Sequence, residues 1–263
     1  GSHFLWKMVR RMVGVLVDNP LGKVPRGVNL GEPDYNFYRR RQWGLGYEFT
    51  HRFSSALKFT QNVRWGEYHE YQQIIYAAGL GADNRTVSRF NFPFADDVSQ
   101  FTVDSRFDAN FSTGVIEHRV LAGVDYRHLD GTSWYRNGAA PDLDLIAPVY
   151  GQTIPLPGAE GTWLDQKERR RQTGIYVQDQ ISFADKWVLT IGGRQDWARN
   201  RIKDHLTGTT TTIKGDKFTW RAGLSYVSPQ GLVPYFSYAT SFEPQAGTDF
   251  FGNAFVPTTG EQY

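Results

Sequence analysis

The feature that most constrains this chain is an alternation of apolar and polar residues with a period of two, repeated along most of its length. Residues 43–50 carry Trp, Leu, Tyr and Phe at odd positions, and Gly, Gly, Glu and Thr at even ones. Similar runs follow at residues 57–65, 101–111, 120–127, 187–197 and 218–226. Because successive side chains of a strand point to opposite faces, each run predicts a two-faced β-strand. Residues 173–183 and 232–242 alternate less cleanly, and Asp179 is a misfit in the apolar row.

Alternation alone leaves a soluble β-sandwich open, because its strands also have one apolar and one polar face. Two features favour a transmembrane barrel instead. The apolar rows carry aromatic residues at their ends, as in an aromatic girdle. The polar rows place Asp104, Arg106 and Asp108 in succession, which suits a water-filled lumen. No apolar run reaches the roughly 18 residues that a membrane-spanning helix needs.

Short and long connections alternate along the chain. The short ones are Arg52–Ala56, Ser112–Ile116, Ala184–Lys186 and Ser228–Gly231. The long ones are Glu67–Ser99, His128–Arg171, Arg199–Lys217 and the segment from Glu243 onward. In outer-membrane barrels the short turns face the periplasm and the long loops face outside. The pattern predicts an all-β fold of about eight long antiparallel strands in meander order, in four hairpins.

Several segments resemble one family in the same order. They are WGLGYEFTHRF (43–53), FTVDSRFDANFSTGVIEHRVLAGVDYR (101–127), TGIYVQDQISF (173–183), LTIGGRQDWA (189–198), FTWRAGLSY (218–226) and YFSYATSFEPQAGTDFFGNAFVPTTGEQY (235–263). The ordered set resembles the TonB-dependent outer-membrane receptors for ferric siderophores, of the ferrichrome or hydroxamate type.

The resemblance implies a barrel of about 22 strands filled by a plug domain. Residues 18–263 are then a partial barrel domain, an interior segment of the wall. Nothing in the chain resembles the plug or the energy-coupling segment. Residues 1–17 stay an unassigned N-terminal tail.

The function implied by the resemblance is binding and TonB-dependent import of a ferric siderophore at the outer membrane of a Gram-negative bacterium. The implied partners are the siderophore, the TonB complex through the missing plug, outer-membrane lipid and lipopolysaccharide. Iron enters only within the ferric siderophore, and no resident cofactor is expected. A non-transporting outer-membrane barrel with a structural or adhesive role is the alternative.

Residue types give no sign of an enzyme, a metal centre or a nucleic-acid partner. The chain has no cysteine and six histidines, none spaced as paired metal ligands. A barrel enzyme would need a Ser, His and acidic set at the lumen rim, and none is visible. The formal net charge of +2 does not imply nucleic acid.

Aromatic residues of the predicted outer loops are the candidate ligand contacts. Tyr and Trp join an apolar face to a polar tip, which suits a compact ferric chelate. In the family that the chain resembles, the loop matching Trp134 and Tyr135 carries aromatics that line the ligand pocket. The other candidates are Tyr68, Tyr71, Tyr76 and Tyr150. Girdle or loop packing is the alternative role for each.

Two arginine triplets, residues 39–41 and 169–171, precede strands at the predicted extracellular rim. Parity places Arg39 and Arg41 on the outward row of Trp43. Arg169 and Arg171 fall likewise on the row of Ile175. Arginine forks suit phosphate, so these four predict contacts with lipopolysaccharide. Plain solvation at the rim is the alternative.

Parity also assigns a direction to other side chains, and a one-residue slip would invert every assignment. The residues expected to face lipid are Trp43, Tyr47, Phe59, Val63, Phe107, Val124, Ile191 and Leu224. The residues expected to face the lumen are Lys58, Arg64, Arg106, Asp108, Arg194 and Arg221.

Overall fold

The computed structural model describes residues 27–243, 255 and 258–263, so the predicted tail, residues 1–17, lies outside the described residues. The chain divides into two compact units. The loop unit takes the described residues up to 41 together with 69–96 and 133–165. The wall unit comprises residues 42–68, 97–132 and the described residues from 166 onward.

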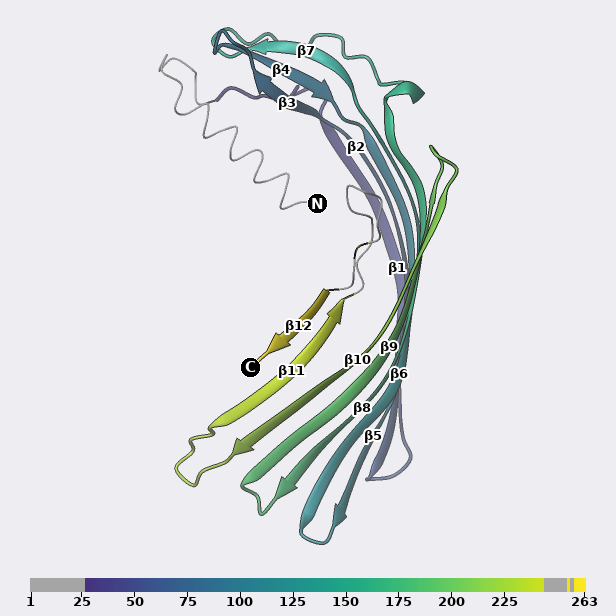
Figure 1. The fold of residues 1–263 in the computed structure, drawn as a ribbon, viewed down its shortest axis with the longest axis vertical. Coiled ribbons are helices and arrows are strands. Elements are labelled where there is room, and N and C mark those ends of the chain that lie inside the picture. The colour runs from purple at the N-terminus through teal and green to yellow at the C-terminus, as the bar shows by residue number, and fades with distance from the viewer. Residues whose placement is uncertain (1–26, 244–254, 256–257) are drawn as a thin grey trace. The chain divides into compact units, whose positions relative to one another are not determined.

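Long strands make up most of the fold, in the order β1-β2-β5-β6-β8-β9-β10-β11-β12 within one sheet (Figure 1). The strands are β1 (Phe37–Arg52), β2 (Leu57–Gln73), β5 (Phe94–Thr113), β6 (Ile116–Arg136), β8 (Thr162–Phe183), β9 (Trp187–Asp204), β10 (Thr210–Tyr226), β11 (Tyr235–Glu243) and β12 (Thr258–Gln262). The β8–β9, β9–β10, β10–β11 and β11–β12 pairs are antiparallel. The meander of eight long strands is therefore confirmed, and β12 adds a ninth strand.

The predicted loop Arg199–Lys217 is wrong in its extent. β9 and β10 stay paired up to Lys203 and Thr210, so most of that segment is strand. Its Arg and Lys side chains hid the alternation, because charged residues occupy both faces at this level. The connection near Ser228–Gly231 is longer than expected, since β10 ends at Tyr226 and β11 begins at Tyr235.

The β8–β9 connection shows how tightly the short turns are made. Ala184 and Asp185 both have positive φ angles, of 51° and 54°. The Lys186 amide donates a hydrogen bond to the Phe183 carbonyl at 3.2 Å. Two successive left-handed residues give a turn whose twist matches that of the strands it joins.

The strands of the wall unit have one apolar and one charged face, as the alternation predicts. Phe59 lies 5.0 Å from Phe107 between ring centroids. On the other face, Lys58 pairs with Asp108 at 3.2 Å, and Arg106 pairs with Asp104 at 2.9 Å. Register places Leu189, Leu224 and Phe236 on one face, and Gly192 and Arg221 on the other. The predicted separation of apolar and charged residues onto opposite faces is confirmed, whereas the assignment of one face to lipid and the other to the lumen stays a prediction.

Asp179 was the misfit of the apolar row, and its neighbours explain it. It pairs in register with Ile191, so it does lie on the apolar face. There it bonds His118 Nδ1 at 2.7 Å, while His118 Nε2 bonds the Thr113 hydroxyl at 2.7 Å. This chain of hydrogen bonds links the ends of β5, β6 and β8. A carboxylate is tolerated on an apolar face when a partner satisfies it.

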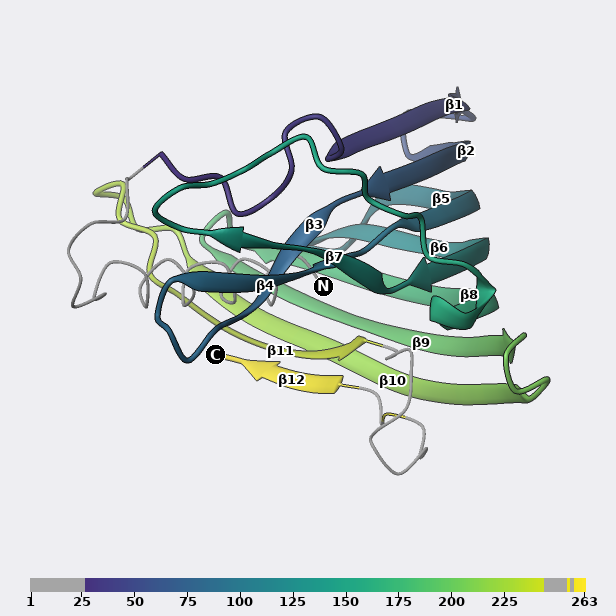
Figure 2. The same cartoon turned by 90° about the horizontal axis from the view of Figure 1, so that it is seen from above.

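The loop unit holds a second sheet that the sequence did not predict. Its strands β3 (Ile75–Leu80), β4 (Thr86–Asn91) and β7 (Gly138–Asp144) lie side by side in the order β3-β4-β7 (Figure 2). A short 3-10 turn, η1 (Ala159–Gly161), precedes β8. The two longest predicted loops therefore contain ordered strands.

The core of the loop unit is small and closed. Val87 is 3% exposed, and Leu145 is fully buried. The buried guanidinium of Arg89 pairs with Glu32 at 3.2 Å and donates to the Gly31 and Pro141 carbonyls. These bonds join three segments that are distant in sequence.

Among the described residues, no helix combines the length and the apolarity needed to cross a membrane.

Candidate functional site

The candidate aromatic residues of the loop unit fall into two separate clusters. In the first, Tyr71 lies 5.5 Å from Phe37 and 6.0 Å from Trp134, measured between ring centroids. The Arg136 guanidinium lies 4.7 Å from the Trp134 ring. A cation held over the face of an indole is attracted by the ring quadrupole.

The second cluster surrounds Tyr135. Its ring lies 5.2 Å from Phe94, 5.4 Å from Trp163 and 6.0 Å from Phe92. Its hydroxyl donates to Asp96 at 3.3 Å. Neighbouring residues of a strand point to opposite faces, so Trp134 and Tyr135 cannot line one surface together. Sequence reasoning had treated them as a pair.

Trp163 is an exposed aromatic residue of this cluster that sequence reasoning missed, as it also missed Phe92 and Phe94. It is 50% exposed and stands beside Tyr135. Its position inside the long predicted loop 128–171 could have drawn attention to it, because the other loop aromatics were chosen on that ground.

Tyr76 and Tyr150 are held by structural contacts. Tyr76 packs against Phe90 and Phe92 at 5.6 and 5.7 Å. Burial raises the pKa of its hydroxyl above the ordinary value. Tyr150 donates to the Asn29 carbonyl at 2.9 Å and accepts from the Asn29 amide at 3.0 Å. Its hydroxyl therefore fastens residues 27–36 to the rest of the loop unit.

The first arginine triplet divides between two faces. Arg40 pairs with Glu70 at 3.4 Å, and Tyr38 donates to the same carboxylate at 2.8 Å. Phe37 instead contacts Tyr71, one residue along β2 from Glu70. Odd members of β1 therefore share the face of Tyr71 and Trp134. Even members share the face of Glu70, which by alternation is also the face of Tyr68.

The second triplet divides in the same way. Arg169 bonds Asp130 at 2.9 Å, and Lys167 bonds the same carboxylate at 3.0 Å. Arg170 instead bonds Glu168 at 2.8 Å. Asn200 donates to that carboxylate as well, at 2.8 Å. Adjacent arginines thus have different partners on different faces.

Register shows that the row of Arg169 and Arg171 continues across two more strands. The opposed pairs are Lys167 with Lys203, Arg169 with Arg201, Arg171 with Arg199, and Arg199 with Lys214. Like charges placed directly opposite one another are destabilising. Seven cations therefore form a ladder on one face, and the carboxylate bonded to two of them is Asp130. The alternation of Arg199, Arg201 and Lys203 was the sequence signal for it.

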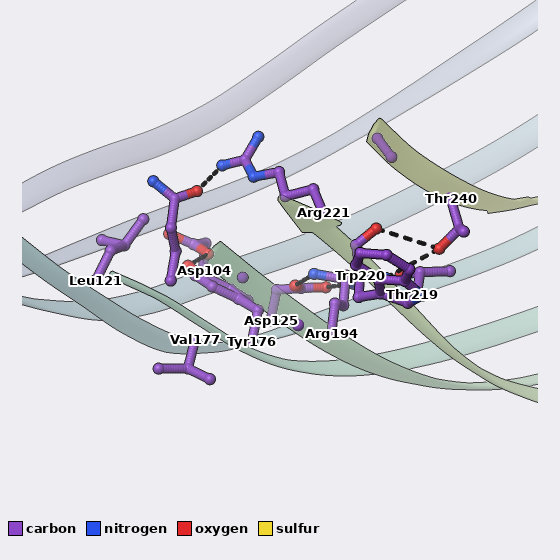
Figure 3. Close-up of a pocket in the computed structure, with 14 residues that line it drawn as sticks. Asp104, Leu121, Asp125, Tyr176, Val177, Arg194, Thr219, Trp220, Arg221 and Thr240 are labelled. Carbon is purple, nitrogen blue, oxygen red and sulfur yellow. Dashed lines mark hydrogen bonds and ion pairs between the residues drawn. The ribbon is translucent and has the colours of Figure 1, made fainter. Parts of the chain in front are cut away.

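The charged face of the wall unit carries a connected polar network. Arg194 bonds Asp125 at 2.5 Å and Asp196 at 2.6 Å. Tyr176 donates to Asp104 at 2.5 Å. All of these residues except Asp196 border a cavity of about 530 Å³, shown in Figure 3, where Val177 points to the other side of the sheet. In the described part of the chain, no cluster of three or more His, Cys, Asp or Glu side chains could hold a metal ion.

Comparison with known proteins gives a consistent answer. The family described as "TonB dependent receptor-like, beta-barrel" matches residues 9–263. The ferrichrome outer membrane transporter/phage receptor of Escherichia coli K12 is 32% identical over 95% of this chain and 36% of its own. The ferrioxamine B receptor of Salmonella typhimurium SL1344 is 32% identical over 95% of this chain and 35% of its own.

Solved structures agree on the fold. The siderophore receptor PiuA from Acinetobacter baumannii superposes with a TM-score of 0.77 at 17% identity, over 91% of this chain and 39% of that one. The ferric-catecholate import receptor Fiu of E. coli K12, in its closed form, gives a TM-score of 0.75 at 19% identity. That match covers 92% of this chain and 40% of Fiu. The chain spans about a third of the length of the curated relatives.

Proposed function

The chain belongs to the family of TonB-dependent receptor β-barrels, and on that premise we propose that it is part of a receptor that imports a ferric siderophore. The observation that carries the proposal is the 32% identity to a ferrichrome transporter over 95% of the chain. The ferrioxamine B receptor matches to the same degree. A ferric hydroxamate is therefore the proposed ligand class.

In the proposed receptor the wall unit spans the outer membrane of a Gram-negative cell. Its apolar face meets lipid, and its charged face meets the barrel interior. Exposed Leu189, Ile191 and Leu224 support this arrangement, because water would not favour them at a third or more exposure. The TonB complex would act through a plug domain supplied by the rest of the receptor.

For the ligand contacts we propose the cluster of Tyr135 and Trp163, with Tyr68 and Tyr76 as further candidates. Tyr71 and Trp134 share a face with Arg39 and Arg41 in the loop unit. They fit the ligand role less well if that face meets the lipid side. Tyr150 is proposed to act indirectly, by fastening the loop that it bonds.

The import proposal is tested by radioactive iron uptake with the full-length receptor in a Gram-negative host that lacks its own hydroxamate receptors. Ferric hydroxamate uptake should appear with the receptor and vanish in a host without TonB. A ferric catecholate serves as the matched control substrate. TonB-independent uptake, or no binding of any siderophore, would favour the alternative of a structural or adhesive barrel.

We also propose that the cationic ladder binds lipopolysaccharide phosphates, together with Arg39 and Arg41. Opposed like charges need a counterion, and arginine forks match phosphate geometry. Replacing Arg39, Arg41, Arg169 and Arg171 with Gln should lower the lipopolysaccharide that co-purifies with the receptor. Replacing Arg40 and Arg170, which point to the other face, is the matched control. Equal retention in both variants would leave only solvation for these residues.

The ladder offers a sharper version of the same test. Arg199 and Arg201 belong to the ladder from a second strand, β9, and the sequence had not suggested them as lipopolysaccharide contacts. Their replacement with Gln should lower retention as well, and the remaining binding should weaken further in salt, since exposed charges are screened over about 8–10 Å.

A further inference from the structure

The cluster around Tyr135 combines aromatic rings with a carboxylate. Tyr135 lies on β6, and its ring contacts Phe94 of β5 at 5.2 Å and Trp163 of β8 at 5.4 Å, measured between ring centroids. Its hydroxyl lies 3.3 and 3.5 Å from the two carboxylate oxygens of Asp96. Phe94 and Asp96 are two residues apart on β5, so alternation places them on one face of that strand. All four residues belong to the loop unit.

Aromatic rings beside one carboxylate have the chemistry of a site for an organic cation. The face of a ring attracts an ammonium group through its quadrupole, and a carboxylate accepts the N–H bonds of that group. Trp163 is 50% exposed, and Asp96 and Tyr135 are partly exposed, so an incoming group can reach them. Phe92 extends the aromatic surface, because its ring is stacked on Trp163 at 6.0 Å.

The hydrogen bond between Tyr135 and Asp96 is a long one. Bonds from a hydroxyl to an oxygen usually measure about 2.5–3.0 Å, whereas the shorter of these two distances is 3.3 Å. A charged donor binds a carboxylate more strongly than a neutral hydroxyl does. A carboxylate accepts about four hydrogen bonds, so Asp96 can hold the Tyr135 hydroxyl and an ammonium group together.

The neighbouring arginines leave the sign of the site unchanged. Arg136 of β6 lies 4.7 Å from the Trp134 ring, and alternation places both on the face opposite the cluster. Arg40 pairs with Glu70 at 3.4 Å, so these two charges offset each other. The arrangement therefore favours a cationic group over an anionic one at Asp96.

We infer that this cluster holds the pendant ammonium group of a ferric hydroxamate, with Asp96 as the residue that binds it. The inference deepens the proposed function and rests on it, because it names the charge of the ligand at the proposed contacts. Ferric hydroxamates occur with and without such an amine, and Asp96 sets the preference between them. Overall identity does not distinguish the two, since the ferrichrome transporter and the ferrioxamine B receptor both match the chain at 32%.

The test compares two ligands that differ only in this group. Ferrioxamine B is a linear ferric trihydroxamate that ends in a primary ammonium, and its N-acetylated form is neutral at that position. Binding of each to the full-length receptor is measured by equilibrium dialysis with radioactive iron. The wild type should bind the ammonium form about tenfold more tightly, which is the scale of one hydrogen bond to a charged group. Asp96→Asn should abolish that difference and leave binding of the acetylated form unchanged, which also shows that the variant is folded.

Asp97→Asn is the matched control. Asp97 is the next residue of β5, so its side chain points to the opposite face of the strand. Its replacement removes the same charge and should keep the tenfold preference. Tyr135→Phe keeps the ring and removes the hydroxyl that competes for the carboxylate, so it should keep or raise the preference.

The inference is overturned if the wild type binds the two ligands equally, or if the preference survives Asp96→Asn. It is also overturned if Asp97→Asn or Tyr135→Phe removes the preference as completely as Asp96→Asn does. Loss of both ligands in Asp96→Asn would show a structural role for the carboxylate and would overturn it too. All these results leave the import proposal standing, provided that the wild type binds the acetylated form. If the wild type binds neither ligand, the proposed ligand class fails, and this inference fails with it.

Discussion

The loop unit and the wall unit bury different kinds of side chain. Every hydrophobic residue that is buried in the described part of the chain lies in the loop unit, including Ile75, Val87 and Leu143. The wall unit instead exposes Ile191 and Val177 by 44% and 54% while holding Asp196 at 4%. The loop unit keeps its apolar residues inside. The wall exposes apolar residues on one face, as its proposed contact with lipid requires, and carries polar contacts on the other.

The two units are also held together by different interactions. In the loop unit a small apolar core is fixed by one buried ion pair, Arg89 with Glu32. In the wall the backbone ladder holds the strands, and on the charged face Tyr176 of β8 lies over Gly123 of β6 and bonds Asp104 of β5. Substitutions of the same kind should therefore have different effects in the two units.

The largest effect is expected at the buried ion pair. Arg89→Met leaves the Glu32 carboxylate buried without its partner, which typically costs about 3–5 kcal/mol. The loop unit should then open, and limited proteolysis of the intact receptor should cut within residues 75–91 or 138–145. The wall strands should stay protected.

Two controls sharpen this result. Arg85→Met breaks an ion pair with Asp144 whose side chains are 48% and 34% exposed, so it should cost far less stability than Arg89→Met. The double variant Arg89→Met with Glu32→Leu should recover much of the loss, because an apolar pair of similar volume can replace a buried ion pair. Equal protease sensitivity of the Arg85 and Arg89 variants would contradict a closed loop core.

The next effect tests the apolar face of the wall. Ile191→Arg places a charge on the proposed lipid face, at a cost of about 2–4 kcal/mol near the bilayer midplane. Thr190→Arg changes the adjacent residue, which points to the charged face, and should be tolerated. The unfolding temperature of the receptor in detergent or bilayers, read from heat-modifiable gel migration, compares the two. A larger loss for Thr190→Arg would invert the assignment of the faces.

The sequence predicted the wall well because its strands are long and alternate strictly. In the runs that begin at Trp43 and Phe101, apolar and polar residues alternate. That alternation assigns each side chain to one face of its strand. It missed the sheet of the loop unit, because β3, β4 and β7 are only six or seven residues long. Their core depends on residues such as Val87 and Leu145, which are brought together by tertiary contacts.

Prediction of the candidate site was limited by the same physics. Trp134 and Tyr135 are adjacent in sequence, which suggested a shared role, but strand alternation separates them. Arg199 and Arg201 were assigned to a loop, so their place in the cationic ladder depended on a cross-strand register that one sequence does not reveal. The contact of Tyr176 with Asp104 across Gly123 was missed for the same reason, since it joins three strands.

A moderate effect is expected in the wall at Gly123, which Tyr176 crosses to bond Asp104. Gly123→Ala puts a Cβ 2.5 Å from the Tyr176 hydroxyl and 2.8 Å from the Ser105 carbonyl oxygen. Overpacking of this kind costs about 1–3 kcal/mol. Gly223→Ala is the matched control, because its nearest neighbours would be 3.5 Å away, an ordinary contact. The same unfolding assay should give a lower unfolding temperature for Gly123→Ala than for Gly223→Ala. Equal temperatures would show that Tyr176 can move aside without loss of stability.

The smallest effect concerns the turn between β3 and β4 in the loop unit, and it depends on pH. Asp83 accepts hydrogen bonds from the Thr86 hydroxyl at 2.6 Å and from the Thr86 and Arg85 amides at 3.0 Å. The Thr86 hydroxyl contributes most to lowering the Asp83 pKa from 3.8 to about 2, followed by the two amides. Since the folded pKa is depressed, the carboxylate stabilises the turn above pH 3.8, and that contribution is lost as the pH falls toward 2.

Asp83→Asn removes the titration while keeping the shape of the side chain, so it isolates the effect. Hydrogen exchange of the Arg85 and Thr86 amides, each corrected for intrinsic exchange, should show greater turn opening in the wild type at pH 2.5 than at pH 6. In Asp83→Asn the opening should be the same at both pH values. Because Asp83 is exposed, the change should stay within the turn and leave the core residues Val87 and Leu145 protected. If the opening spreads to the core at pH 2.5, carboxylates other than Asp83 also stabilise the loop unit. The loop unit would then depend on charged groups, as the polar face of the wall does.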